Sequence, residues 1–276
     1  MGLFKLFSRR SPAPQPPAQE EPVTQAEGPL TIYVANVQGQ GERERQEDSF
    51  AIVNPAEGEQ RERQGLLALV ADGMGGMEDG KAASQWASEC FLQLFQERET
   101  EDIPAWFYRS VHAVSDSVFQ QFGGRSGTTL VAVHIQAERL HWLSVGDSGI
   151  FLLRSGGVFQ LNREHTCLNR LLLQELEQET IEKERAFSDP DAPRLTSFVG
   201  IDRLTEVDLS LRPLALQRGD VLLLCSDGIG GVLTPPELME AMVLPPEEGC
   251  ALLERMVLEK GVLGQDNYTG ILISCQ

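Results

Sequence analysis

Acidic residues in this sequence stand beside apolar segments that are typical of buried strands. Three aspartates end such a segment, and three further acidic residues lie near the start of one. A carboxylate beside a buried strand destabilises the fold unless a partner compensates its charge. The residues at segment ends are Asp72, Asp147 and Asp227, and those near segment starts are Glu47, Asp48 and Asp266.

This repeated pattern predicts a cation site. A single Asp-Gly pair is most often a turn former, but several in one chain indicate a shared role. If the strands are neighbours, the carboxylates converge and need cations to offset their repulsion. Carboxylate oxygens, without Cys or His at metal-binding spacing, suit Mg²⁺ or Mn²⁺ better than zinc or copper.

The order of the motifs resembles the protein phosphatase 2C (PPM) family, and most closely its bacterial branch, where DGMGG is usual. No single motif is specific, but six in this order are. The resemblance covers about residues 31–275. The motifs are Arg43 with Glu47 and Asp48, the DGMGG segment 72–76, SGTT at 126–129, GDS at 146–148, SDG at 226–228, and Asp266 with Asn267.

The resemblance implies the metal ligands. Asp72 would bridge two Mn²⁺ or Mg²⁺ ions, and the carbonyl oxygen of Gly73 would bind one of them. Asp227 and Asp266 would hold the other ion. Asp147, together with Asp227, matches the position of a third, weaker ion in bacterial members.

The resemblance also implies roles for three residues near the ions. Glu47 and Asp48 would act at least partly through bound waters. Arg43 would grip the substrate phosphate, because its planar guanidinium fits two phosphate oxygens. The nearby Arg45 serves as its natural control. Arg43, Asp72 and Asp227 are thus the expected catalytic residues.

The function implied is hydrolysis of phosphoserine and phosphothreonine in proteins by a metal-activated water, opposing a Ser/Thr kinase. This makes the chain a protein-serine/threonine phosphatase that acts in signalling. The alternative is a catalytically silent, phosphatase-like regulatory or binding module, and a third reading is hydrolysis of small phosphate esters. The presence of Asp72, Asp227 and Asp266 favours the enzyme.

Some positions depart from the family pattern. Met74 stands where eukaryotic relatives have His, so a different group must protonate the leaving group. Gly149 replaces the usual Arg and removes a positive charge beside Asp147. His165 is expected to be a structural residue of the flap. The milder departures are Gln46 and Glu164.

The elements that must position these residues follow from periodicity. Helical patterns come in pairs between runs of hairpin-connected strands, which favours an α+β fold with antiparallel sheets over a parallel doubly wound sheet. The resemblance implies a four-layer αββα sandwich, two antiparallel β-sheets flanked by helix pairs. Expected strands are 31–37, 49–54, 65–71, 128–136, 140–146, 149–155, 158–162, 207–211, a run within 219–228, and 268–274. Expected helices are 83–95, 104–122, one short pattern at 171–176, one from Thr234 and one over 246–261.

Composition bounds the domains and partners. The chain has 276 residues and a formal net charge of −18, which argues against binding nucleic acid. Residues 11–30 hold six of the fifteen prolines, so residues 1–30 are predicted to be a disordered N-terminal segment. Residues 31–276 are then the catalytic domain, with a flap at about 166–195. The expected partners are phosphorylated proteins and a cognate Ser/Thr kinase, and the chain is expected to be a monomer.

Location is inferred from cysteines and apolar runs. The five cysteines are scattered and odd in number, which indicates reduced thiols in a cytoplasmic protein. No apolar run is long enough for a transmembrane segment, and the N-terminus lacks the apolar stretch of a secretory signal. Residues 1–10 combine apolar and basic side chains, so weak docking on a membrane is the alternative.

Overall fold

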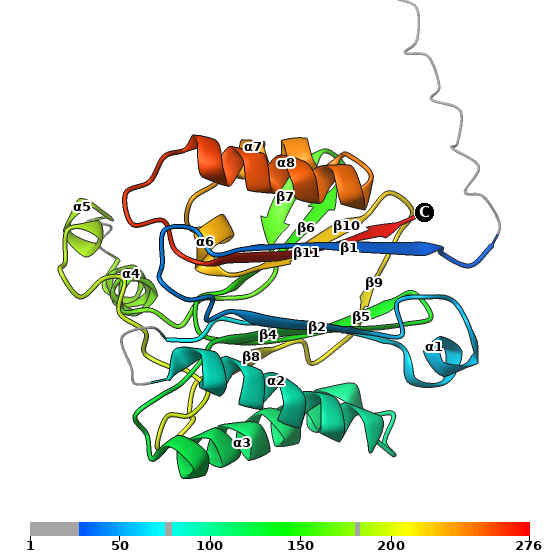
Figure 1. Ribbon diagram of the computed structural model, residues 1–276, viewed down its shortest axis with the longest axis horizontal. Helices are drawn as coiled ribbons and strands as arrows, with labels where there is room; N and C mark the ends of the chain where they lie inside the picture. Colours follow the sequence, from blue (N-terminus) through cyan, green and yellow to red (C-terminus); the bar gives the residue numbers. More distant parts are fainter. Residues whose placement is uncertain (1–27, 75–78, 180–182) are drawn as a thin grey trace, which may run out of the picture.

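Two antiparallel β-sheets stack face to face, and a pair of helices covers the outer face of each (Figure 1). The computed structural model of the chain describes residues 28–74, 79–179 and 183–276. The first sheet has the strand order β1-β11-β10-β6-β7. The second has the order β2-β3-β4-β5-β8, with β9 also paired to β5. The predicted four-layer αββα sandwich is therefore confirmed.

The strands have these bounds: β1 Ile32–Gly39, β2 Ser49–Val53, β3 Leu66–Ala71, β4 Leu130–Gln136, β5 Arg139–Val145, β6 Gly149–Arg154, β7 Gly157–Gln160, β8 Asp208–Leu209, β9 Leu214–Ala215, β10 Val221–Cys225 and β11 Tyr268–Cys275. The helices are α1 Glu59–Gln64, α2 Gly80–Gln96, α3 Ile103–Phe122, α4 Cys167–Glu177, α5 Lys183–Phe187, α6 Asp227–Gly230, α7 Pro235–Met242 and α8 Pro246–Glu259.

Strand β3 explains how the layers stack. All six of its residues are buried, because one face meets helices and the other meets the opposite sheet. Successive side chains of a strand point to opposite faces. Leu67 and Leu69 accordingly pack in the core under α2 and α3, while Leu66 and Val70 pack between the sheets. A continuous apolar run thus marks a strand with a core on each side.

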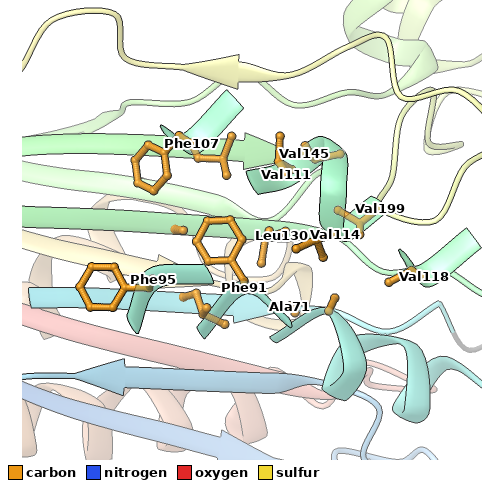
Figure 2. Close-up of a cluster of buried hydrophobic side chains, with 14 of the residues drawn as sticks. Ala71, Phe91, Phe95, Phe107, Val111, Val114, Val118, Leu130, Val145 and Val199 are labelled. Carbon is orange, nitrogen blue, oxygen red and sulfur yellow. The ribbon is translucent and has the colours of Figure 1, made fainter. Parts of the chain in front are cut away.

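The core beneath α2 and α3 is built around aromatic side chains (Figure 2). Phe91, Phe95 and Phe107 are fully buried, and the rings of Phe91 and Trp106 meet edge to face with centroids 5.3 Å apart. Edge-to-face contacts place the positive ring edge on a negative ring face. Both helices agree with the predicted periodicity, and α3 ends at Gly123, whose φ of 63° suits glycine.

The opposite outer face is covered by α7 and α8. The start of α7 carries the predicted capping box, in which Thr234 and Glu237 satisfy each other's free backbone N–H groups. Leu238, Leu253 and Leu272 pack in the core beneath these two helices. This helix pair anchors the sheet whose strands β10 and β11 lie next to Asp227 and Asp266 in the sequence.

The structure differs from the sequence expectations in several elements. The predicted loop between β2 and β3 contains the short helix α1, which buries none of its residues and so left no apolar periodicity. Helix α4 begins earlier than the predicted pattern because the Thr166 hydroxyl caps it by accepting from the N–H of Asn169. The predicted strand 207–211 shortens to two residues, and β9 and α6 were not expected.

Two sequence predictions concern membranes and the N-terminus. Within the part of the chain that the structure describes, no helix has the length and apolarity needed to cross a bilayer. The predicted disordered segment, residues 1–30, lies almost wholly outside the described residues. Gly75 and Gly76 of the DGMGG motif also lie outside them.

Candidate active site

The register of the strands gathers the acidic motifs at one end of the sandwich. Cys225 of β10 pairs with Gly149 of β6, which leaves Asp227 and Asp147 each two residues from that pair. Asp266 lies two residues before the Tyr268 end of β11. The residues meet around a cavity of about 210 Å³, whose walls are Arg43, Glu47, Asp72, Gly73, Met74, Thr129, Asp147, Leu195, Asp227 and Asp266. Seven of the eight residues predicted for the site thus line one cavity, and Asp48 does not.

Asp72 is fixed through its own main chain. Its N–H donates to the Thr129 hydroxyl at 3.0 Å, and the Thr128 hydroxyl donates to its carbonyl oxygen at 2.8 Å. These bonds account for the SGTT motif, for which sequence reasoning gave no role. A Cβ at the following Gly73 would lie 2.2 Å from the Gly80 carbonyl oxygen, so this position accepts only glycine.

The carboxylates repel one another in this cavity. Burial, followed by the nearby charge of Asp227, raises the pKa of Asp147 to about 7. The pKa of Asp227 is raised by burial and then by Asp266, and that of Asp72 is raised well above its ordinary value, chiefly by burial and then by Asp48. Burial and the neighbouring carboxylates thus both disfavour the charged forms of these acids. A bound cation would supply compensating positive charge.

Asp48 lies behind the cavity rather than in it. It is fully buried, and its Oδ2 accepts hydrogen bonds from the Ser226 hydroxyl at 2.9 Å and the Thr269 hydroxyl at 2.7 Å. Burial raises the pKa of Asp48 to about 6. Asp48 therefore packs behind the cavity against Ser226 and Thr269, and its water-mediated role stays a prediction.

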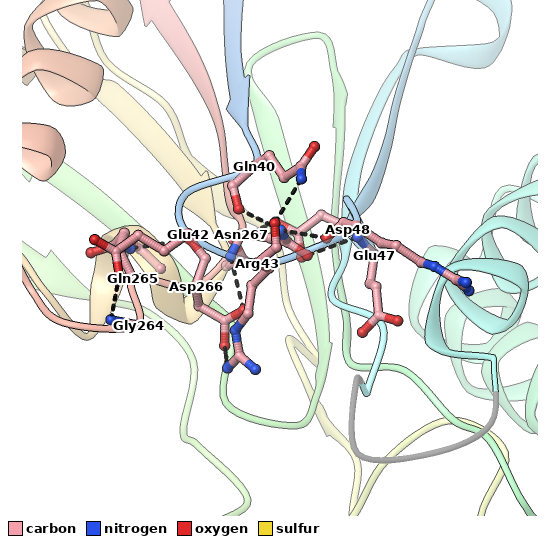
Figure 3. A network of polar contacts seen from close by, with 12 residues as sticks. Gln40, Glu42, Arg43, Glu47, Asp48, Gly264, Gln265, Asp266 and Asn267 are labelled. Carbon is pink, nitrogen blue, oxygen red and sulfur yellow. Dashed lines mark hydrogen bonds and ion pairs between the residues drawn. The ribbon is translucent and has the colours of Figure 1, made fainter.

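Arg43 and Asp266 form an ion pair across the mouth of the cavity (Figure 3). The Arg43 Nη2 lies 2.6 Å from the Asp266 Oδ2, and the Arg43 side chain is 52% exposed. The guanidinium therefore stands at the cavity, where an incoming phosphate would meet it. In the structure its partner is a predicted metal ligand.

Asn267 holds the loop that carries Arg43 and Glu47 (Figure 3). Its Oδ1 accepts from the N–H of Glu47 at 2.8 Å, and its Nδ2 donates to the carbonyl oxygens of Gln40 and Arg45 at 2.8 and 2.9 Å. Three bonds from one amide fix the path of this loop. Asn267 belongs to one of the sequence motifs, but the sequence alone predicted no role for it.

His165 joins the base of the flap to the loop of Asp147. The ring Nδ1 of His165 accepts a hydrogen bond from the backbone N–H of Gly146 at 3.1 Å. The backbone N–H of His165 donates to the Gly146 carbonyl oxygen at 2.8 Å. Burial lowers the pKa of His165, which favours the neutral ring that accepts this bond. The ring therefore has the structural role that the sequence indicated.

The acidic residues fit hard divalent cations. Oδ1 of Asp227 and Oδ1 of Asp48 are buried and have no hydrogen-bond partner among the described residues. Each oxygen can therefore still accept a hydrogen bond or contact a cation. In the described ranges, however, no three His, Cys, Asp or Glu side chains already form a metal-binding group. Asp266 is engaged by Arg43 in an ion pair. Mg²⁺ and Mn²⁺ also accept water and carbonyl oxygens as ligands.

Fold and site together define a class of protein, a two-sheet sandwich with an acidic cation pocket between the ends of its sheets. A protein-family model described as protein phosphatase 2C matches residues 42–249. The chain belongs to the protein phosphatase 2C family.

Sequence relatives agree with this assignment. The serine/threonine phosphatase stp of Listeria innocua is 30% identical over 219 residues, which span 75% of this chain and 83% of that protein. The serine/threonine protein phosphatase PstP of Mycobacterium tuberculosis is 31% identical over 215 residues, 75% of this chain and 40% of that longer protein.

Solved structures share the fold. The crystal structure of the Mycobacterium tuberculosis phosphatase PstP/Ppp has a TM-score of 0.71 at 26% identity, covering 89% of this chain and 98% of that one. A structure of the PstP catalytic domain in complex with two manganese ions has a TM-score of 0.69 at 25% identity, covering 89% and 99%.

Proposed function

We propose that this chain is a protein-serine/threonine phosphatase that depends on Mn²⁺ or Mg²⁺. The observation that carries the proposal is the cavity in which Asp72, Asp147, Asp227 and Asp266 converge beside an exposed arginine. Family membership and relatives named as serine/threonine phosphatases support it. The manganese complex of a related domain supports two ions at the site.

The resemblance to the family implies the ligand assignment, and the convergence of these residues in one cavity supports it. Asp72 and the carbonyl oxygen of Gly73 would hold one ion, and Asp72, Asp227 and Asp266 would hold the other. Asp147 would serve a third, weaker ion together with Asp227. Glu47 and the buried Asp48 would act through water. When bound, such ions supply a water of lowered pKa as nucleophile and offset charge on the phosphoryl oxygens.

The residues of the chain orient the substrate. The Arg43 guanidinium, which pairs with Asp266 in the structure, would take two phosphate oxygens once Asp266 is used as a ligand. Asn267 keeps this arginine at the mouth of the cavity by holding its loop. A catalytically silent module would lack a metal-holding carboxylate, and Asp72, Asp227 and Asp266 are all present.

The setting of the enzyme is also a proposal. Residues 31–276 would form the catalytic domain, with the flap at 166–195 and a disordered segment at 1–30. Its substrates would be proteins that a cognate Ser/Thr kinase of a bacterial signalling pathway has phosphorylated. The five scattered cysteines support a location in the reducing cytoplasm, and we propose that the chain acts as a monomer.

Phosphate release from phosphoserine, phosphothreonine and phosphotyrosine peptides tests the function. With Mn²⁺, the first two peptides should be hydrolysed, and EDTA should abolish the reaction. Asp72→Asn should lower the rate about a hundredfold or more, since even outer-shell partners of metal sites are worth about 10–100-fold. The control Asp116→Asn, at an exposed position of α3, should leave it unchanged. Turnover in EDTA, or full activity of Asp72→Asn, would overturn the proposal.

A further inference from the structure

A second cavity of about 390 Å³ adjoins the acidic one. The two share Asp147 and Asp227 as walls. The chain segment 192–195 also borders both, because Leu195 faces the acidic cavity while Ala192 and Pro193 face the second. A group bound at the carboxylates would therefore lie directly beside the second cavity.

Part of the inner wall of the second cavity is apolar because two glycines leave room for a ring, while Glu164 and Thr166 line it together with Asp147 and Asp227. Phe151 of β6 lies between Gly149 and Gly230. A Cβ at Gly149 would lie 2.4 Å from the ring carbon Cε2 of Phe151, and a Cβ at Gly230 would lie 3.6 Å from it. Because neither glycine has a side chain, the Phe151 ring borders the cavity.

The outer wall belongs to the flap and is held in place. Leu168 of α4 and Pro193 contribute apolar surface. The N–H of Leu168 donates to the carbonyl oxygen of Ala192 at 2.8 Å, and the N–H of Cys167 donates to that of Arg194 at 2.8 Å. The two ends of the flap thus bind each other.

The flap is also tied to the acidic site. His165, directly before this wall, exchanges two hydrogen bonds with Gly146, the residue preceding Asp147. Because the same loop carries Asp147, the apolar walls keep a fixed position relative to the carboxylates. In Figure 1, α4 lies at the same end of the sandwich as α6, which begins at Asp227.

We propose that this second cavity is a substrate subsite that takes an apolar side chain next to the phosphorylated residue. The proposal rests on the proposed phosphatase function. Its occupant follows from continuity with the acidic cavity: a peptide whose phosphate lies at Asp227 and whose chain runs toward the flap places a neighbouring residue close to Phe151 and Leu168. Burial of an apolar side chain there removes its surface from water, so the enzyme would prefer phosphopeptides with leucine at that neighbouring position.

A set of phosphothreonine peptides tests this subsite. The host peptide carries alanine at the three positions on each side, and one alanine at a time is replaced by leucine. Values of kcat/KM are measured for the full chain with Mn²⁺. We expect leucine to raise kcat/KM about tenfold at one flanking position, the lower end of what one small apolar group achieves in a pocket.

Substitutions in α4 test whether the leucine preference arises at the second cavity. Leu168→Glu should abolish the leucine preference, and Leu168→Ala should reduce it if the glutamate variant fails to fold. Leu176→Glu, at a 58% exposed position of the same helix, should keep it. Hydrolysis of p-nitrophenyl phosphate, which has no flanking residue, should equal the wild-type rate in Leu176→Glu and should remain measurable in the Leu168 variants, which shows that they are folded.

The outcomes separate this subsite from the phosphatase function. Normal p-nitrophenyl phosphate hydrolysis without a leucine preference at any position would overturn the subsite alone. A leucine preference that survives in both Leu168 variants would overturn the assignment of the cavity. Failure of the wild-type chain to hydrolyse any phosphoester with Mn²⁺ would overturn the phosphatase function and the subsite with it.

Discussion

Replacing Asp147 by asparagine should stabilise the metal-free protein at neutral pH. The folded chain raises the pKa of this carboxyl from 3.8 to about 7, chiefly through burial and then through the charge of Asp227. The folded state therefore binds the proton more tightly than the unfolded state does. The free energy of unfolding consequently falls as the pH rises from about 4 to about 7.

The magnitude follows from the pKa. A rise from 3.8 to about 7 corresponds to about 4 kcal/mol, since one pH unit is worth about 1.4 kcal/mol. Solvent reaches part of the Asp147 side chain, and screening by water reduces the effect to about 2 kcal/mol. Asparagine keeps the shape of the side chain without its charge, so Asp147→Asn should recover this amount at pH 8.

Urea unfolding in EDTA measures the effect at pH 5 and pH 8. The variant should exceed the wild type at pH 8, and the difference should shrink at pH 5, where the wild-type carboxyl is largely protonated. Saturating Mn²⁺ should also shrink it, because the cation offsets the charge. Asp116→Asn is the exposed control and should have no effect. Equal stabilities of wild type and Asp147→Asn at pH 8 in EDTA would refute the reasoning.

Three further variants test other parts of the account. Arg43→Ala should raise KM for a phosphopeptide about 10–100-fold, which is the worth of a charge-assisted hydrogen bond. The control Arg45→Ala should change KM less than about twofold. Similar effects of both variants would refute the role of Arg43. Asn267→Ala should lower kcat/KM about 10–100-fold, as loss of a supporting contact does, with an unchanged circular dichroism spectrum; wild-type kinetics would contradict its positioning role. Asp220→Ala removes the carboxylate that pairs with Arg154 at 2.6 Å and should lower the free energy of unfolding in urea by about 1.5–3 kcal/mol, the worth of hydrogen bonds to a charged group. A loss below about 1 kcal/mol would contradict it.

Local patterns in the sequence were sufficient to predict most elements of the fold. The six apolar residues of β3 and the i, i+3, i+4 spacing in α2 reflect burial on two faces and on one face, respectively. Helix α1 escaped prediction because its six residues bury nothing and carry no periodicity. The two-residue strands β8 and β9 are set by pairing with β5, which is a tertiary contact.

The sequence indicated which residues gather at the candidate site, but it did not indicate the contacts that hold them there. Motif order indicated Asp72, Asp147, Asp227 and Asp266. The pairing of β10 with β6 and β11 brings the last three together, and the stacking of the two sheets adds Asp72, which follows β3. The burial of Asp48 behind the cavity depends on Ser226 and Thr269, which are distant in sequence. The Arg43–Asp266 pair likewise joins residues 223 positions apart.

The central claim is that the acidic cavity holds two divalent cations that make the chain a phosphatase. The most direct test is a Mn²⁺ titration in which bound Mn²⁺ and phosphate release from a phosphothreonine peptide are measured in the same samples, for the wild type and Asp227→Asn. The account predicts that release rises as two ions bind per chain, and that Asp227→Asn loses both tight binding and release. Release that is independent of Mn²⁺, or that persists at the wild-type rate in Asp227→Asn, would contradict it.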